Sequence, residues 1–450
     1  MGLTLIRKST GRPRKRNPRV ALVLAGGAVS GGAFKVGGLK ALDDFLIGDR
    51  RMCDFDTYVG LSAGSVLAVP LAAGIPPNEM VRVLDGTSRR FNQLRPLDFY
   101  TPNTREFFER PAKFAYDLFG YWPGLAADLA RSLPDLPEVL RQATQEAIRK
   151  PGYTSFERLV MQLHAHLSPD REAPSLFNHI PSGVFDSRGL EQWLSKNLRR
   201  IRMPNDFEAF RRRRENDLYI CATDLDTSER VVFGADENTD LTISEAVQAS
   251  VAIPGFYKPA RLAGVDYVDG GLRHTANIDV AVEKGADLVI CYNPFRPFIN
   301  HVEDAHEGDG YFSNGRYLAD RGLKVVINQA FRTLLHSRLK LGLQRYISDD
   351  SFKGDIVLIE PREQDANFFA MNPLAFWKRG EAVRHGFESV RRTVEQNFEP
   401  LAEVFEHYGL SMCEDTARKR ANRFRAERGW DGNLEEEDEG EPTHLRVVRA

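Results

Sequence analysis

Residues 20–47 read VALVLAGGAVSGGAFKVGGLKALDDFLI. The apolar run Val20–Ala25 predicts a buried strand of a parallel sheet, because such strands are covered on both faces. Gly26–Gly32 predicts a glycine-rich turn, and the apolar residues between Ala33 and Ile47 recur at helical spacing. This order of strand, turn and helix is typical of an α/β fold.

The same order of elements repeats directly downstream. Thr57–Val59 predicts a short strand, Gly60-Leu61-Ser62-Ala63-Gly64 a tight turn, and Ser65–Ala73 an apolar helix. Two consecutive units of this kind indicate a mainly parallel central sheet. The uncharged stretch Thr57–Asn78 is long enough to span a bilayer, but its glycines and prolines favour a buried strand, turn and helix over that minor alternative.

Changes in composition predict the domain organisation. Residues 1–19 hold seven lysines and arginines and no acidic residue, which predicts a basic flexible arm. Residues 20–400 form the predicted α/β domain, interrupted by a helical insertion at about residues 95–200 that is rich in aromatics and prolines. Residues 401–450 are a predicted charged extension that ends in a disordered tail.

Two of these segments keep two interpretations each. Four residues of the insertion share one helical face: Ala112, Ala115, Phe119 and Trp122. Such a face suits either an acyl-binding site or lid, or an ordinary core helix. The basic arm either contacts an anionic membrane peripherally or is a solvated tail.

The overall composition narrows the class of protein. A hydrophobic content of 42% excludes a wholly disordered chain. The 61 basic and 63 acidic residues nearly cancel, so we expect no nucleic-acid partner. Four widely spaced cysteines form neither a disulfide framework nor a metal motif, and no secretory signal is apparent. We therefore expect a cytoplasmic protein that associates with membranes at most peripherally.

Ser62 is the candidate nucleophile. A sharp turn between a strand and a helix exposes a serine hydroxyl, and flanking glycines avoid steric clash in that turn. The N–H of Ala63 then lies at a helix N-terminus, where backbone donors favour an anion. The alternative is a tight turn in which Ser62 only caps the helix.

The loop Gly26–Gly32 carries backbone N–H groups that no large side chain screens, and such a nest holds an oxyanion or a phosphate. No Lys-Ser/Thr pair follows, so it is not a P-loop. Three interpretations remain: an oxyanion loop beside Ser62, a dinucleotide loop with Asp43 or Asp44 as the ribose-binding acid, or a loop that serves packing alone.

Asp269 ends the predicted strand Val265–Val268 and precedes Gly270 and Gly271. Asp-Gly pairs are common in turns, so this dipeptide says little alone. Upstream stands the segment ASVAIPGFYKP (residues 249–259). Together with LAGGAVSGGAFKVGGLKAL (24–42), GLSAGS (60–65) and VDGGLR (268–273), in this order, it resembles the patatin-like phospholipases over about residues 20–400.

The resemblance implies a three-layer α/β sandwich and a lipid acyl hydrolase that cleaves carboxylic esters of phospholipids or related lipids. It implies a dyad in which Ser62 is the nucleophile and Asp269 its base, an acyl-enzyme intermediate, and neither metal nor cofactor. The residues that it assigns to the oxyanion hole are Gly26, Gly27 and Ala28, helped by Ala63. The glycines that it assigns to the motifs are Gly31, Gly60, Gly64, Gly270 and Gly271.

Two positions depart from the family pattern. Ala28 stands where the family loop has its third glycine, and alanine tolerates a positive φ poorly. Ser30 replaces a common arginine. Ala28 keeps open a catalytically inactive patatin-like binding module. Two further alternatives stay open on other grounds: a nucleotide-binding α/β protein that uses the glycine-rich loop, and a triad completed by His274 or His385.

Overall fold

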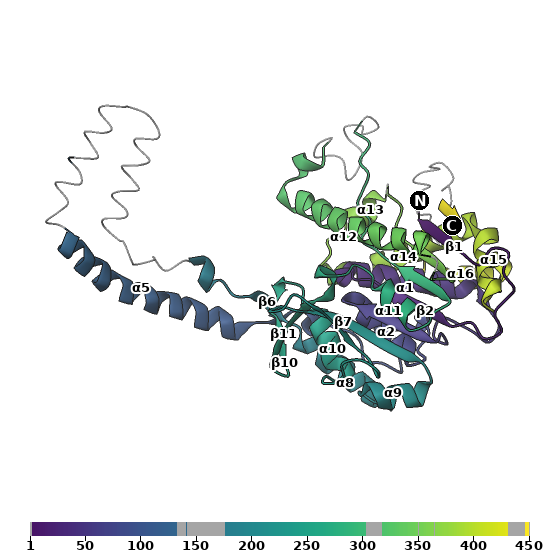
Figure 1. Ribbon diagram of the computed structural model, residues 1–450, viewed down its shortest axis with the longest axis horizontal. Coiled ribbons are helices and arrows are strands. Elements are labelled where there is room, and N and C mark those ends of the chain that lie inside the picture. The colour runs from purple at the N-terminus through teal and green to yellow at the C-terminus, as the bar shows by residue number, and fades with distance from the viewer. Residues whose placement is uncertain are drawn as a thin grey trace. The chain divides into compact units, whose positions relative to one another are not determined.

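The computed structural model describes residues 2–132, 141, 176–302, 317–349, 351–363, 365–430 and 446–449. The chain divides into two compact units, the first made of residues 1–101 and 185–450, the second of residues 102–184 (Figure 1). The predicted insertion of about residues 95–200 was therefore too wide. Helices α4 (Pro96–Phe99) and α8 (Arg188–Arg200) belong to the first unit, where Leu190 and Trp193 of α8 are buried in the core.

The first unit is built on a large mixed sheet. Its five central strands are parallel, in the order β7 (Asp217–Asp224), β4 (Thr57–Leu61), β2 (Val20–Leu24), β12 (Leu288–Tyr292) and β13 (Asp355–Ile359). Beyond β7 the sheet continues antiparallel with β11 (Val265–Asp269) and β10 (Ala260–Leu262), and β8 (Arg230–Phe233) also pairs with β7. Beyond β13 lie β1 (Leu3–Arg7) and β15 (Arg446–Arg449). The predicted mainly parallel sheet is confirmed.

Alternate residues of the central strands point into two separate cores, one on each face of the sheet. Leu22 and Leu24 belong to the core beneath α1 (Ala28–Phe45), α2 (Ala63–Ala72) and α14 (Arg379–Gln396). Ala21 and Val23 belong to the core beneath α11 (Ile278–Glu283) and α12 (Leu323–Ser348). The three-layer α/β arrangement follows from this period of two (Figure 1).

Shorter elements complete the first unit. The remaining helices are α3 (Pro77–Asp85), α9 (Phe207–Arg214), α10 (Ile243–Ser250), α13 (Ala366–Ala370), α15 (Phe398–His407) and α16 (Glu414–Glu427). The 3-10 turns are η2 (Gly270–Leu272), η4 (Leu318–Arg321) and η5 (Phe376–Lys378), and the remaining strands are β3 (Leu46–Ile47), β9 (Gly255–Tyr257) and β14 (Ser411–Met412).

The structure corrects the sequence-based view of both ends. Residues 3–7 are not a flexible arm: they form β1, which pairs with β13, and its Leu5 and Ile6 are buried. The exposed part of the segment is limited to residues 10–17. At the other end, Phe424 of α16 is buried against Phe387 of α14, with ring centroids 4.9 Å apart. The extension therefore packs onto the first unit as far as residue 430.

The stretch Thr57–Asn78 forms β4, a turn and α2, as the glycines and prolines indicated. None of the helices in the described ranges has the length and hydropathy that crossing a bilayer requires.

The second unit contains the 29-residue helix α5 (Thr104–Ser132) and the 3-10 turn η1 (Leu176–His179). The chain enters this unit at β5 (Thr101–Pro102) and leaves it at β6 (Gly183–Asp186). Phe119 and Trp122, two residues of the predicted helical face, are exposed. The rest of the predicted insertion, residues 133–140 and 142–175, lies outside the described residues.

Candidate active site

Ser62 lies in a strained turn between β4 and α2. Its φ of +51° and ψ of −129° fall outside the regions that residues with a side chain normally adopt. Its side chain makes no capping hydrogen bond to α2, which argues against the interpretation of Ser62 as a simple helix cap. The Ser62 N–H donates to the Ser250 hydroxyl at 2.8 Å, and that hydroxyl donates to the Cys221 carbonyl at 2.7 Å.

The two glycines around Ser62 are required by close packing. A Cβ atom at Gly60 would lie 2.5 Å from the Cα of Ser65, and one at Gly64 would lie 2.0 Å from the carbonyl oxygen of Leu24. Both distances are shorter than any side chain tolerates. The missing side chains therefore bring the Ser62 turn directly against the end of β2, where the glycine-rich loop begins.

Asp269 ends β11 and is buried beside Ser62. Its Oδ1 accepts a hydrogen bond from the N–H of Gly271 at 2.8 Å. Burial raises the pKa of Asp269 to about 6, against the opposing effects of the Ser62 hydroxyl, the Gly271 N–H and the positive charge of Lys35. Gly270 sits so close to β7 that a Cβ would lie 2.7 Å from the Cys221 carbonyl oxygen.

A single short segment connects the two candidate catalytic residues. Ser250, the last residue of α10, holds the N–H of Ser62, and the Ala252 carbonyl accepts the N–H of Asp269 at 2.9 Å. Sequence reasoning used this segment only for the family resemblance and assigned it no role. Its place along the chain, between the two motifs, was the available signal.

The glycine-rich loop contributes backbone donors beside Ser62. A Cβ at Gly26 would lie 3.4 Å from the Cβ of Ser62. Gly27 and Ala28 have φ values of +151° and +50°, so Ala28 does adopt the left-handed conformation that the missing third glycine put in question. Within the described ranges, no acceptor pairs with the N–H groups of Gly26, Gly27, Ala28 or Ala63, whereas Gly31 donates to the Gly27 carbonyl at 2.9 Å.

Lys35 holds this loop from behind and was missed by sequence reasoning. Its side chain is fully buried on α1, and its Nζ donates to the carbonyls of Ala25 and, at 2.9 Å, Gly26. Burial lowers the pKa of Lys35 to about 7. Because both carbonyls point toward the amine, the N–H groups of the same peptide units, those of Gly26 and Gly27, point away from it. The only sequence signal was a lysine between apolar and small residues in the first half of the helix.

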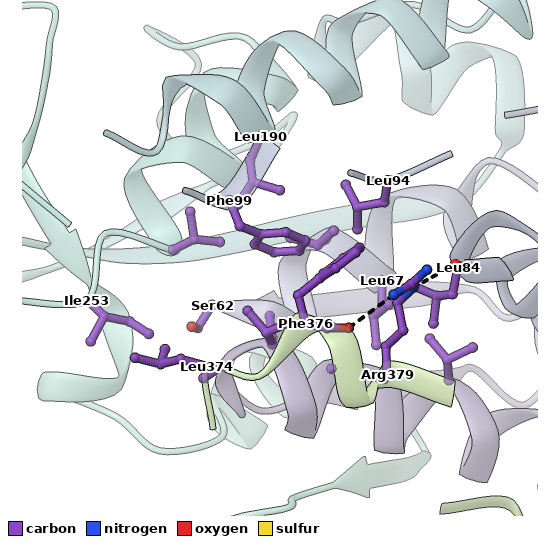
Figure 2. A pocket seen from close by; sticks show the side chains of 18 of the residues that line it. Ser62, Leu67, Leu84, Leu94, Phe99, Leu190, Ile253, Leu374, Phe376 and Arg379 are labelled. Atoms are coloured by element: carbon purple, nitrogen blue, oxygen red, sulfur yellow. Dashed lines mark hydrogen bonds between the residues drawn. The ribbon is translucent and has the colours of Figure 1, made fainter. Parts of the chain in front are cut away.

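An apolar pocket starts at Ser62 and contains about 630 Å³ of space, counting the part that is open to solvent. Figure 2 shows Ser62 near one end, and Leu84 and Arg379 toward the other. The Arg379 guanidinium donates to the Leu84 carbonyl at 2.8 Å and to the Phe376 carbonyl at 3.3 Å. The apolar walls of the pocket include Val36, Val66, Leu67, Leu94, Phe99, Leu190, Val251, Ile253 and Leu374.

The structure records other partners for the two candidate histidines. His385 is paired with Asp365, its Nε2 lying 2.8 Å from both carboxylate oxygens. Burial and the charge of Arg230 lower the pKa of His274. In the part of the chain that the structure describes, no histidine is hydrogen-bonded to Ser62 or Asp269.

The candidate ribose-binding acids are engaged elsewhere. Asp43 is buried and paired with Arg51 at 2.6 Å, and Asp44 is buried and paired with Lys40. A carboxylate in such a pair is not free to bind a ribose hydroxyl, which weakens the nucleotide-binding alternative.

The family model described as patatin-like phospholipase matches residues 22–282, more than half of the 450 residues. The chain belongs to the patatin-like phospholipase family. This patatin-like phospholipase is thus an enzyme, a lipid acyl hydrolase, and the resemblance inferred from its four motifs is confirmed.

Three solved structures are also similar. VipD from Legionella pneumophila is 15% identical, with 88% of this chain and 70% of that chain covered and a TM-score of 0.33. Full-length ExoU, in its complex with SpcU from the type III secretion system of Pseudomonas aeruginosa, is 21% identical, with coverages of 56% and 40% and a TM-score of 0.22. Human GIVD cytosolic phospholipase A2, in complex with methyl gamma-linolenyl fluorophosphonate, is 10% identical, with coverages of 87% and 59% and a TM-score of 0.31.

Proposed function

We propose that this chain hydrolyses carboxylic ester bonds of phospholipids or related lipids through Ser62 and Asp269. The observation that carries the proposal is the burial of the Asp269 carboxylate within hydrogen-bonding reach of the Ser62 hydroxyl, with the glycine-rich loop and its backbone N–H groups next to the serine. That arrangement supplies a nucleophile, a base and an oxyanion site in one place.

In the first half of the reaction, Asp269 accepts the hydroxyl proton of Ser62 while Oγ attacks the ester carbonyl carbon. The negative charge that develops on the carbonyl oxygen is stabilised by the N–H groups of Gly26, Gly27, Ala28 and Ala63. When the tetrahedral intermediate collapses, the C–O bond to the alcohol breaks, and the protonated Asp269 gives its proton to the leaving oxygen. Ser62 is left esterified to the fatty acid.

In the second half, water replaces the alcohol. Asp269 accepts a proton from the water while the water oxygen attacks the acyl carbon, and the same N–H groups stabilise the second oxyanion. Collapse breaks the bond to Ser62 Oγ, which recovers its proton from Asp269, and the fatty acid leaves. Each backbone donor contributes about 2.7–4 kcal/mol of transition-state stabilisation, judged by removal of such donors in other enzymes.

The raised pKa of Asp269 makes this chemistry more favourable. A carboxylate with the ordinary pKa of about 3.9 is a weak base toward a serine hydroxyl. Burial raises the pKa of Asp269 to about 6, which brings its basicity closer to neutral pH while leaving most of the group ionised there. The apolar pocket beside Ser62 accepts the acyl chain, because burying apolar surface of the chain against the apolar walls is favourable.

The sequence-based proposal that residues 1–19 contact an anionic membrane now concerns the exposed cations Arg12, Arg14, Lys15 and Arg16, of which Lys15 is paired with Asp287. They precede the amino end of β2, whereas Ser62 follows the carboxyl end of the parallel strand β4. A contact through this segment alone would leave the active site facing away from the lipid.

The test combines covalent labelling and turnover. Wild-type protein should react with a fluorophosphonate and release fatty acid from a panel of lipids, and Ser62→Ala should do neither while remaining folded. Ser244→Ala is the matched control, because Ser244 is a buried serine of α10 that is bonded to Glu191 and not to the site. A folded Ser62→Ala variant with activity within about tenfold of wild type would refute the assignment. A thermal shift on adding nucleotide, without labelling, would instead favour the nucleotide-binding alternative.

A further inference from the structure

Helix α12 exposes an apolar face to solvent. Leu323, Ile327 and Leu334 are 74%, 57% and 59% exposed. Val326 and Phe331 lie beside them and are also exposed. We call these five residues the α12 apolar face. Their spacing places them on one side of the helix, while Arg332, Leu335, His336, Leu339 and Leu343 on the opposite side are buried against the sheet.

The charge of α12 is of one sign. Between Leu323 and Ser348 the sequence has five lysines and arginines and no acidic residue, although the chain as a whole holds 63 acidic residues in 450. Lys324, Arg338 and Lys340 are exposed around the apolar face, and the nearest described acidic residues along the chain, Asp320 and Asp349, lie beyond its two ends. Apolar side chains flanked by cations, without acids, are typical of helices that bind the surface of an anionic bilayer.

The α12 apolar face adjoins the active site within the first unit. The ring of Phe331 packs against Phe295 with centroids 6.3 Å apart, and Phe295 lies so close to Gly26 that a Cβ there would be 2.9 Å from its ring. Farther along the helix, Arg338 donates to the carbonyl of Leu272 at 2.5 Å, three residues after Asp269. The ring of Phe295 thus separates the α12 apolar face from the glycine-rich loop. Helix α12 lies in the outer layer of the first unit (Figure 1).

We propose that the α12 apolar face, with Lys324, Arg338 and Lys340, docks this protein on an anionic lipid surface next to the glycine-rich loop of the candidate active site. That the lipid surface also supplies the substrate rests on the proposed function, but docking on the surface does not require catalysis. A second copy of the chain is a poorer occupant, because a twofold contact through α12 would bring lysines and arginines of both copies together without acidic partners.

The experiment measures co-sedimentation of full-length Ser62→Ala protein with vesicles of phosphatidylglycerol and phosphatidylcholine in equal parts, and with vesicles of phosphatidylcholine alone. We expect tighter binding to the anionic vesicles, and binding that fades as salt is added. The double variant Leu323→Ser/Ile327→Ser should bind them at least about tenfold more weakly. Lys324→Gln/Lys340→Gln should lower the preference for anionic vesicles and the salt dependence.

Leu97→Ser is the matched control, because Leu97 is 72% exposed, as Leu323 is, but lies on α4 of the same unit. It should bind anionic vesicles as the parent does. With Ser62 restored, the variants should hydrolyse a soluble short-chain ester at the parent rate, so that a failure of docking is distinguished from a failure of the proposed catalysis. Circular dichroism confirms folding.

Three outcomes would overturn the proposal. The first is vesicle binding that the double α12 variant leaves unchanged, or no binding by the parent at low salt. The second is an equal loss in Leu97→Ser, which would mean that any exposed leucine suffices. The third is a parent dimer, seen by light scattering, that Leu323→Ser/Ile327→Ser converts to a monomer with vesicle binding intact, since the face would then be a self-interface.

Discussion

The backbone N–H of Ser62 donates to the hydroxyl of Ser250, 188 residues later in the chain, at 2.8 Å. The Ser250 hydroxyl in turn donates to the carbonyl of Cys221 on β7. The position of the candidate nucleophile is therefore held by three elements that are distant in sequence, and these contacts support the strained φ of Ser62.

Ser250→Ala should lower kcat by about ten- to hundredfold and destabilise the protein by about 1–3 kcal/mol. The substitution leaves the buried N–H of Ser62 without its acceptor, and loosens the geometry of attack. Urea unfolding and turnover of one soluble ester measure the two effects. Ser244→Ala on the same helix should show a comparable loss of stability with little change in kcat. Equal effects on kcat in both variants would reduce the role of Ser250 to general stability.

Lys35→Met should lower kcat with little effect on KM. Methionine fills similar volume but cannot donate to the carbonyls of Ala25 and Gly26, so the oxyanion loop loses the contacts that orient it. The charge of Lys35 also lowers the pKa of Asp269, so the variant's activity should require higher pH than that of wild type. Lys40→Met is the control, because Lys40 is also buried on α1 but pairs with Asp44. A pH profile that moves equally in both variants would contradict the proposed link.

Asp269 predicts opposite effects of pH on activity and on stability. In the proposed mechanism Asp269 acts as its carboxylate, so kcat/KM should rise as pH increases through about 6. The folded pKa of about 6 lies above the unfolded value of 3.8, so the folded state binds more protons between these pH values, and the free energy of unfolding falls as pH rises across that window.

A shift of about two pKa units corresponds to about 3 kcal/mol once Asp269 is ionised. Asp269→Asn removes this penalty, so the variant should be more stable than wild type above pH 6, and the difference should shrink toward pH 4. Its kcat should fall nearly as far as that of Ser62→Ala, since an amide accepts no proton. Thermal melts and turnover across this range test both statements; a wild-type rate in Asp269→Asn would remove Asp269 from the mechanism.

A dyad also predicts which histidines are dispensable. His385→Ala should lose the pair with Asp365 and some stability, and His274→Ala should lose little, but both should retain most of the kcat. In a triad the members act as a unit, so loss of the histidine is about as damaging as loss of the serine. The measurement is kcat/KM on one ester, with circular dichroism of each variant. A fall of about 10³ in a folded histidine variant would replace the dyad with a triad.

The local elements and the site motifs could be predicted from the sequence because their signals are local. The apolar run at Val20 and the glycines around Ser62 determine a strand and a turn whatever the distant chain does. Leu3–Arg7 was misjudged because a five-residue strand next to many cations has no pattern of its own until β13 lies beside it.

The contacts that hold the site together were not predictable in the same way. The Ser62–Ser250 hydrogen bond and the burial of Lys35 behind Gly26 depend on which segments the fold brings together. A single serine or lysine in a sequence does not indicate which residue it will bind. The exposed face of α12 is another such case. An amphipathic pattern indicates that one side is buried, and only the fold shows that the more exposed side is also apolar.

In the glycine-rich loop, Ala28 stands where the family pattern has a glycine. Gly27→Leu should disable hydrolysis, because a Cβ at Gly27 would lie 2.8 Å from the Cγ of Pro294 and the backbone φ of +151° disfavours any side chain.

Ala28→Gly should leave kcat unchanged or raise it. Glycine relieves about 1 kcal/mol of strain at a φ of +50° but adds a similar entropic cost in the unfolded chain, so the free energy of unfolding should change by less than about 1 kcal/mol. Turnover of a short-chain ester and urea unfolding of each variant test this pair. If folded Gly27→Leu retains the wild-type kcat, the loop does not bind the oxyanion; if Ala28→Gly lowers kcat more than about tenfold, the Ala28 methyl group, which lines the pocket, positions the substrate instead.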